Sequence, residues 1–307
     1  MSYKDRSLYY MLPGMRLAIF IAATGISMIL GAFITFSIVA NYLHVGLTEI
    51  QTVLLQPKNA HISLFANAFA SIIAFMLPSF AVAYLSKGKI SQNFGFQKIG
   101  SIKLVGWVIL LALAGLLLSG AMATLTEMIP IPVNFKQWAE ELEASYKKAM
   151  VVMTQMNSIG DLFINLFAVA LIPAIVEELY FRGALQKTLS AWSGRPIVAI
   201  VVTAIIFSAF HFSYFGFLSR MVLGIVLGFI FEYTRTIWLP ILLHFINNGI
   251  AIIALYSVRG DQHKMDKVMD ENLPLYWGIV AIGLVTYFLH CLKNDAHYER
   301  LEKNILE

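Results

Sequence analysis

Three charged side chains lie close together inside one apolar stretch of the chain. Glu177, Glu178 and Arg182 belong to the run Glu-Glu-Leu-Tyr-Phe-Arg, and the residues around it, 161 to about 189, are mostly apolar. A charged side chain near the centre of a bilayer costs at least ~2.5–3.5 kcal/mol on insertion scales. Such charges normally face the interior of a helix bundle or a wet cavity, so the cluster indicates a functional site.

Two later apolar segments add imidazole and amide groups. His211 ends the run Ile-Ile-Phe-Ser-Ala-Phe-His, and His244 and Asn248 lie in the run Leu-Leu-His-Phe-Ile-Asn-Asn. Together with the first cluster they supply two carboxylates, a guanidinium, two imidazoles and an amide. This set is sufficient for acid–base chemistry on a carbonyl group.

Helical spacing separates the roles of the two adjacent carboxylates. An α-helix turns about 100° per residue, so residues four apart share a face. Glu178 can therefore pair with Arg182, while Glu177 points toward another partner and can act as a general base. The alternative is a buried Glu–Arg pair, with core histidines, that serves packing alone.

Prolines and glycines mark irregular or close-packed places in these segments. Pro173 and Pro240 each remove one helical hydrogen bond and are predicted to open the helix near the site, although ordinary membrane-helix prolines are the alternative. Gly224 and Gly228 form a GxxxG pair, which predicts close helix packing inside the bundle.

The composition places the site in a membrane protein. Of 307 residues, 59% are hydrophobic and 13% are charged, with a mean hydropathy of +0.73, whereas soluble domains carry about 25% charged residues. The net charge of +4 does not indicate a nucleic-acid partner, because the basic residues fall between apolar runs. The single Cys291 excludes an internal disulfide and a cysteine-based zinc cluster.

A membrane span needs about 20 mostly apolar residues. On this criterion we predict an all-α polytopic membrane bundle, one domain over residues 1–307, with its catalytic core at 161–250. About eight transmembrane helices are expected, at residues 17–40, 62–86, 104–128, 161–187, 196–215, 217–234, 237–257 and 275–293.

Basic residues predict the orientation of the bundle. Thirteen Lys and Arg residues fall in the two terminal segments and in the loops on their side of the membrane, against eight on the other side. Because cytoplasmic loops carry the excess of basic residues, both termini are expected to be cytoplasmic.

The connection between the third and fourth spans has a different pattern. Over residues 135–157, apolar side chains recur at helical spacing among glutamates and lysines. This predicts an amphipathic helix that lies at the membrane interface. Its role is either a packed connector or a lid or guide for a substrate.

Three motifs in sequence order resemble those of a known family. Glu177-Glu178-xxx-Arg182, Phe207-xxx-His211 and His244-xxx-Asn248 are similar to the motifs of the CPBP (Abi) group. These are the CAAX proteases and bacteriocin-processing enzymes, which are intramembrane endopeptidases built as eight-helix bundles. The resemblance covers about residues 161–250.

The resemblance implies a role for each motif position. Glu177 would activate the attacking water, with Glu178 and Arg182 bracing the site. His211 would position that water or hold a metal, and His244 and Asn248 would stabilise the oxyanion.

The family is commonly described as metallopeptidases, and a zinc site typically has three protein ligands plus water. Glu177, His211 and His244 could supply these ligands, but the chain has no HExxH helix. A metal-free glutamate mechanism fits the same residues and is the one we favour.

The expected partners are the lipid bilayer and a membrane-associated protein or peptide substrate, either of CAAX type or a bacteriocin or other peptide to be processed. The expected location is a bacterial cytoplasmic membrane, because the chain is compact. Two other classes are compatible with charges at mid-membrane. A transporter would be expected to show an inverted repeat, and none is evident. A non-catalytic membrane scaffold would keep its function after the change Glu177→Gln.

Overall fold

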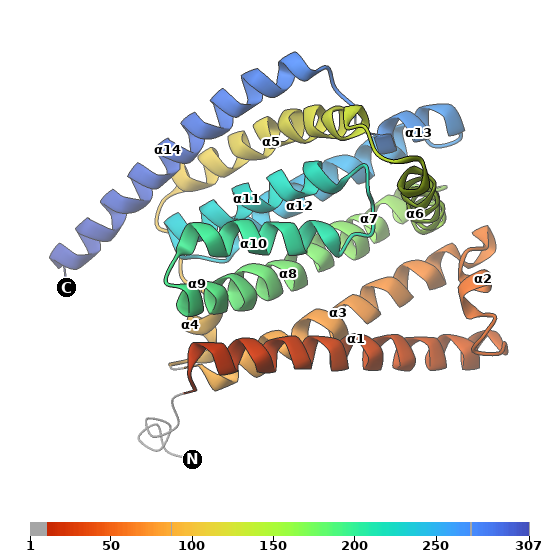
Figure 1. Ribbon diagram of the computed structural model, residues 1–307, viewed down its shortest axis with the longest axis horizontal. Helices are drawn as coiled ribbons and strands as arrows, with labels where there is room; N and C mark the ends of the chain where they lie inside the picture. Colours follow the sequence, from red (N-terminus) through yellow and green to blue (C-terminus); the bar gives the residue numbers. More distant parts are fainter. Residues whose placement is uncertain (1–10, 87, 271, 307) are drawn as a thin grey trace.

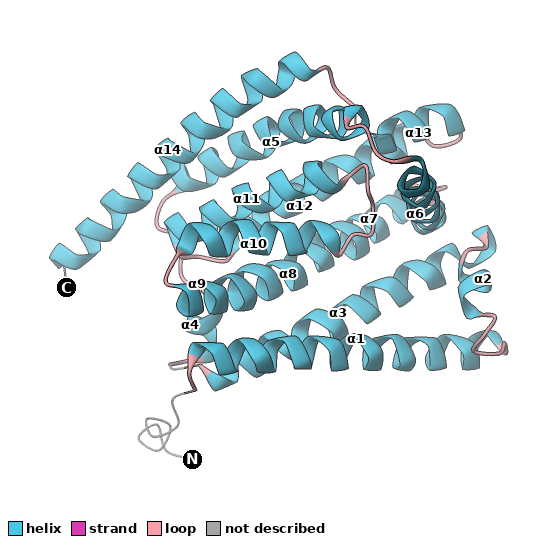
Figure 2. Cartoon of the chain, viewed as in Figure 1, coloured by secondary structure: helices cyan, strands magenta, loops and turns pink. Residues whose placement is uncertain are grey.

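Helices make up the architecture of this chain. The computed structural model describes residues 11–86, 88–270 and 272–306, and within these ranges it contains helices, turns and loops but no strand (Figure 2). The α-helices are α1 Pro13–Leu43, α2 Ile50–Leu54, α3 Ala60–Leu85, α4 Ile90–Phe94, α5 Ile102–Met128, α6 Val133–Met153, α7 Ile159–Asn165, α8 Ile172–Glu178, α9 Lys187–Ser193, α10 Pro196–Ala209, α11 Phe217–Thr234, α12 Trp238–Ser257, α13 Gln262–Asp270 and α14 Leu275–Leu306.

The expected polytopic all-α bundle is confirmed. By length and composition, seven helices in the described residues can cross a membrane: Pro13–Leu43, Pro57–Leu85, Ile102–Met128, Ile159–Ser193, Phe217–Thr234, Trp238–Ser257 and Leu275–Glu299. They coincide with seven of the predicted spans, usually with longer ends. Long apolar runs therefore located the membrane helices correctly.

The remaining predicted span, at 196–215, is shorter than expected. Its helix α10 ends at Ala209 after 14 residues, a length of about 21 Å, and a turn over 210–216 follows. Side chains stabilise this turn, because Ser208 Oγ donates to the Phe217 carbonyl at 2.6 Å and Ser213 Oγ accepts from the Gly216 N–H at 3.1 Å. Such local bonds compete with helix continuation.

The long helices run side by side in alternating directions (Figure 1). The start of α1, the loop between α3 and α5, and the end of α14 lie at one side of the bundle, while α2, α6 and α13 lie at the other. This arrangement places the two ends of the described chain on one side. The predicted cytoplasmic identity of that side stays a prediction, and the extreme termini, residues 1–10 and 307, lie outside the described residues.

The segment Ile159–Ser193 forms one helical rod with two wider turns. The residues Leu166–Leu171 and Leu179–Gln186 are π-helical, and the Ile172 N–H bonds to the Phe167 carbonyl, five residues back. The first wide turn directly precedes Pro173, which lacks an N–H and would clash with the carbonyl four residues earlier in a regular helix. Wide turns of this kind occur frequently at functional sites.

The second proline behaves differently from the expectation. Pro240 is the third residue of α12, which begins at Trp238. A proline in the first turn removes no helical hydrogen bond, because the N–H groups there have no partner within the helix. The prediction that Pro240 opens the helix near His244 was therefore wrong.

The GxxxG pair packs α11 against α10, as predicted. A Cβ atom on Gly224 would lie 3.0 Å from the Ala204 Cβ, and one on Gly228 would lie 2.8 Å from Ile200 Cγ2. Hydrogen in place of a side chain lets the two backbones approach this closely. The carbonyls of the same two glycines accept hydrogen bonds from Arg182 and Gln186, so α11 also contacts the segment that carries the charged cluster.

The amphipathic segment forms α6, whose bounds Val133–Met153 fall close to the predicted 135–157. It lies across the end of the bundle rather than along it (Figure 1). Most of its residues are exposed, but Ala139, Glu143 and Val152 are buried. Its proposed location at the membrane interface stays a prediction.

Candidate active site

The centre of the site is a fully buried ion pair. Arg182 Nη1 donates to Glu178 Oε1 at 2.8 Å, and both side chains are 0% exposed. This is the pair that their four-residue spacing predicts. The second guanidinium nitrogen of Arg182, Nη2, donates to the Gly224 carbonyl at 3.0 Å, so the same side chain also ties this helix to α11.

His244 shares the carboxylate of the pair. Its Nδ1 lies 2.8 Å from Glu178 Oε1, and its side chain is 2% exposed. A carboxylate that already accepts from a guanidinium acts as an acceptor here too, so Nδ1 carries the hydrogen in this contact. This contact holds the ring in place and leaves Nε2 as the ring nitrogen available for chemistry.

Glu177 lies on the other side of the same imidazole. Its Oε2 is 3.9 Å from His244 Nε2, which is too long for a hydrogen bond, and the Glu177 side chain is 14% exposed. Oε2 is buried and makes no hydrogen bond within the described residues. The two adjacent glutamates therefore have different environments: Glu178 accepts from two donors through Oε1, and Glu177 has no hydrogen-bonding partner among the described residues.

Phe207 brings the second motif to the first and third. Its ring centroid lies 4.9 Å from that of His211 and 5.7 Å from that of His244, both with edge-to-face geometry. The Arg182 guanidinium carbon lies 4.9 Å from the same centroid, a cation–π contact. A single aromatic ring thus joins three of the predicted site residues.

His211 lies just beyond the end of α10, in the turn, and not inside a helix as expected. Its Nδ1 is 2.9 Å from the Phe207 carbonyl oxygen, four residues back. The next residue, Phe212, has a φ of 49°, a left-handed conformation that is unusual for an aromatic residue. The ring of His211 is therefore fixed by its Nδ1, and its Nε2 has no hydrogen bond within the described chain.

Asn248 lies one helical turn after His244 on α12 and is half-buried. Its side-chain amide makes no hydrogen bond to any other described residue. It is therefore available to donate to a bound group. All six predicted residues lie on α8, the adjoining π-helical segment, the turn after α10, and α12.

A metal fits this arrangement poorly. In the described ranges, no three His, Cys, Asp or Glu side chains gather as a group that could hold a metal ion. The Nδ1 contacts of His211 and His244 leave Nε2 of each ring free, which is also the usual arrangement of a metal-bound histidine, so these contacts do not argue against a metal. The side chains of Glu177, His211 and His244 are nevertheless not gathered as a three-ligand site among the described residues, and no chemical step is assigned to a metal.

The sequence reasoning missed two polar residues near this cluster. Gln186, 2% exposed, donates through Nε2 to the Gly228 carbonyl at 3.1 Å, which repeats the Arg182–Gly224 contact one turn further along. Arg182 and Gln186 are four residues apart, as are Gly224 and Gly228, and this matching spacing could have predicted both contacts from the sequence. Arg220 is the other residue, and its basic side chain in an apolar helix was a signal of the same kind as Arg182.

The comparisons with known proteins match this part of the chain. Residues 159–250 match a family described as type II CAAX prenyl endopeptidase Rce1-like. The match covers the two glutamates, Arg182, both histidines and Asn248. It confirms the resemblance to the CPBP family that the three motifs indicate.

One curated relative is the uncharacterized protein YpbD of Bacillus subtilis (strain 168), which is 29% identical over 105 residues. That match covers 32% of this chain and 51% of the relative, so the chain spans about half the length of the relative that it matches. No solved structure matches the chain.

Proposed function

We propose that this chain, whose residues 159–250 match the CAAX-type endopeptidase family, is an intramembrane endopeptidase that uses water activated by Glu177. It would hydrolyse a peptide bond of a membrane-associated protein or peptide within the bilayer or at its edge. The observation that carries the proposal is the difference between the two adjacent glutamates. Glu178 is bound by Arg182 and His244, while Glu177 faces the same imidazole with a carboxylate that has no hydrogen-bonding partner among the described residues.

This difference suits general-base catalysis. Glu178 Oε1 already accepts from a guanidinium and an imidazole, which commits this carboxylate to holding Arg182 and His244 in place. The Glu177 carboxylate has no such donor and can take a proton from water. We infer that Glu177 is the base and that Glu178 and Arg182 hold the site together.

The remaining motif residues would serve the carbonyl group of the substrate. The peptide carbonyl becomes an oxyanion when water attacks, and donors aimed at that oxygen stabilise the transition state. Asn248 can donate from its free amide. His244 can donate from Nε2 once this nitrogen carries a proton, with Glu178 orienting the ring through Nδ1. His211 would position the attacking water.

Location and partners follow from the same proposal. The seven apolar helices make the chain a multi-pass membrane protein, and its surroundings are therefore lipid. We propose a bacterial cytoplasmic membrane, with both termini in the cytoplasm, as the setting. A prenylated CAAX protein is the substrate class that we favour, because the matched family carries that description.

The test is the change Glu177→Gln, which keeps the size of the side chain and removes its basicity. We expect cleavage of a farnesylated CAAX peptide by the purified protein to fall by at least ~10²–10⁴-fold, the contribution of a general base. The matched control is Glu140→Gln, an exposed glutamate of α6 that pairs with Lys136 at 3.8 Å. This control should cleave at the wild-type rate.

Turnover of the Glu177→Gln variant at the wild-type rate would show that another group is the base. A parallel search for membrane peptides that accumulate in cells carrying this variant would identify the natural substrate. An unchanged peptide inventory, together with full biological function of the variant, would support a scaffold instead.

A further inference from the structure

Arg220 lies next to the candidate site and forms no ion pair with any described residue. It is the fourth residue of α11, and its Nη1 is buried without a hydrogen-bond partner in the described chain. No carboxylate of the described residues comes within 4.0 Å of its guanidinium. Buried cations are normally paired, because an unpaired charge away from water is costly.

Helix stability does not explain this position. A positive charge in the first turn of a helix opposes the helix dipole, which favours anions there. Arg220 instead interacts with α6, since Nη2 donates to the Tyr146 hydroxyl oxygen at 2.9 Å and the guanidinium carbon lies 4.9 Å from the Tyr146 ring centroid. These two contacts orient the guanidinium and leave Nη1 without a partner.

Gly216 provides the space for this guanidinium. A Cβ atom at Gly216 would overlap the Arg220 Nη1 and would lie 2.9 Å from Ser213 Oγ. The guanidinium therefore packs directly against the backbone of the turn that carries His211. The charge of Arg220 also acts electrostatically on both Glu177 and His211.

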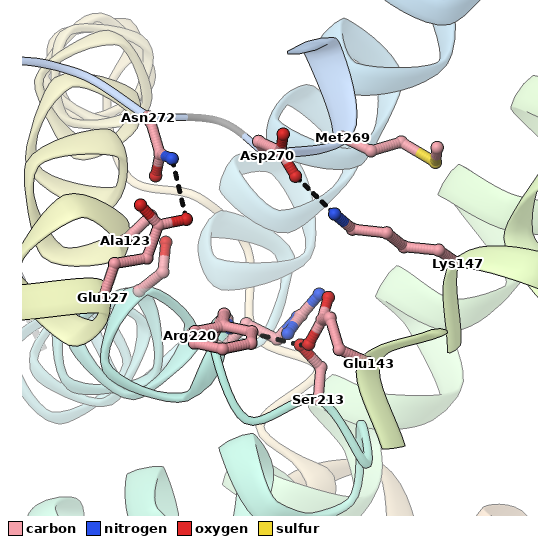
Figure 3. A pocket seen from close by; sticks show the side chains of 12 residues that line it. Ala123, Glu127, Glu143, Lys147, Ser213, Arg220, Met269, Asp270 and Asn272 are labelled. Carbon is pink, nitrogen blue, oxygen red and sulfur yellow. Dashed lines mark hydrogen bonds and ion pairs between the residues drawn. The ribbon is translucent and has the colours of Figure 1, made fainter. Parts of the chain in front are cut away.

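A small polar cavity of about 50 Å³ lies between α5, α6, α11 and α13, and Arg220 lines it together with Ser213, Gly216 and Ser219 (Figure 3). A water molecule occupies about 30 Å³ in the liquid, so the cavity has room for a group of a few atoms such as a carboxylate. It has no room for a longer peptide segment in this conformation.

The acidic side chains that also line this cavity have donors of their own. The three contacts are Glu143 with Ser213 Oγ at 2.8 Å, Glu127 with Asn272 Nδ2 at 2.9 Å, and Asp270 with Lys147. Burial alone would lower the pKa of Lys147, but the hydrogen bond and the charge of Asp270 raise it overall, so Lys147 stays protonated at neutral pH. Of the two cations that line the cavity, Lys147 is paired with Asp270, and Arg220 has no carboxylate of the described residues within 4.0 Å.

We propose that Arg220 binds the carboxyl-terminal carboxylate of the substrate. The inference rests on the proposed function, because a CAAX motif ends three residues after its prenylated cysteine. Three extended residues span about 10 Å, so a free carboxylate enters the bundle close to the scissile bond. A guanidinium can bind a carboxylate through two parallel hydrogen bonds. Arg220 would therefore recognise the free carboxyl terminus of the substrate.

The test compares two farnesylated CAAX peptides that differ only in a free or an amidated carboxyl terminus. We expect wild-type kcat/KM to be about 10- to 100-fold higher for the free acid, the worth of a charge-assisted hydrogen bond. Arg220→Gln should lower cleavage of the acid until the two peptides are nearly equal. Arg220→Lys, which keeps the charge but not the planar fork, should retain part of the preference.

The matched control is Arg259→Gln. Arg259 also lies over a tyrosine ring, 4.0 Å from the centroid of Tyr256, but on the surface. This variant should keep the full preference for the free acid. Equal cleavage of both peptides by the wild type would overturn the proposal, and so would an Arg220→Gln variant that loses both activities in the same proportion.

A binding measurement separates this inference from the proposed function. The aliphatic tripeptide Val-Ile-Met and its amide would be titrated into the Glu177→Gln protein, which needs no turnover. The acid should bind at least about 10-fold more tightly than the amide, and this difference should vanish when Arg220→Gln is added. Equal affinities would overturn the role of Arg220, whereas tight, Arg220-dependent binding without cleavage by the wild type would overturn only the proposed catalysis.

Discussion

Replacing Arg182 by alanine leaves the Glu178 carboxylate without its cation in a place that solvent does not reach. Both side chains are 0% exposed, and they meet at 2.8 Å. Removing one partner of a buried ion pair costs about 3–5 kcal/mol in free energy of unfolding, because the other charge stays buried and uncompensated. We expect Arg182→Ala near the lower end of this range, since His244 still donates to Glu178.

Glu178→Ala should be more damaging than Arg182→Ala. It removes the acceptor of two donors at once, the guanidinium of Arg182 and Nδ1 of His244. We expect the free energy of unfolding to fall by about 5 kcal/mol, the upper end of the range for breaking a buried ion pair. The double variant should lose less than the sum of the single losses by about 0.5–3 kcal/mol, the usual coupling between residues in one network.

The matched control is Gln186→Ala on the same helix. Gln186 is 2% exposed and donates to the Gly228 carbonyl just as Arg182 donates to that of Gly224. It carries no charge, so its removal should cost only about 1 kcal/mol for a neutral hydrogen bond, in addition to the lost packing. Comparing Gln186→Ala with Arg182→Ala separates the stabilisation that comes from the buried charge pair from the stabilisation that comes from the hydrogen bond to α11.

The assay is equilibrium unfolding in mixed detergent micelles, followed by tryptophan fluorescence, for the wild type and the four variants. Two results would refute the reasoning. One is an Arg182→Ala loss no larger than that of Gln186→Ala. The other is additivity of the Glu178 and Arg182 losses to within about 0.5 kcal/mol, which would mean that the two side chains do not interact energetically.

Two further predictions concern the metal and the topology. Because we favour the metal-free mechanism, we expect the purified protein to keep its proposed activity after exhaustive chelation. Elemental analysis should find much less than one zinc per chain. One zinc per chain, with activity lost on chelation and restored by zinc, would establish a metalloenzyme. Because basic residues predict cytoplasmic termini, reporter fusions near Gly95 and after Leu306 should read cytoplasmic and one near Gln262 external. Opposite signals at the first two positions would contradict the arrangement of the helices in Figure 1.

The matched family segment and the class of the fold follow from local sequence patterns. Long apolar runs located seven membrane helices because a span must satisfy its backbone hydrogen bonds internally and must be long enough to cross the bilayer. The Glu178–Arg182 pair also followed from spacing alone, since residues four apart in one helix must lie close together. The GxxxG contact was predictable for a similar reason, because only small residues permit such close packing.

The end of α10 was not predictable from hydropathy. The sequence stays aromatic and apolar through Phe210, Phe212 and Phe215. The helix nevertheless ends at Ala209, where serine side chains bond to the backbone of the following turn. The bond from Ser208 goes to Phe217, the first residue of α11, and therefore depends on the position of that helix, so the placement of His211 in a turn emerges only from the folded chain.

Contacts between helices are what the tertiary structure alone decides here. His244 and Glu178 are 66 positions apart, and Arg182 and Gly224 are 42 apart. Membrane helices are apolar on nearly all faces, so the hydrophobic pattern does not specify which face meets which neighbour. The sequence by itself therefore determined which chemical groups are present. It also determined which side chains of one and the same helix lie close enough to pair with each other. The rotation and packing of the helices decided that Glu178 binds His244, that Glu177 has no hydrogen-bonding partner in the described part of the chain, and that Arg220 lies beside the turn of His211.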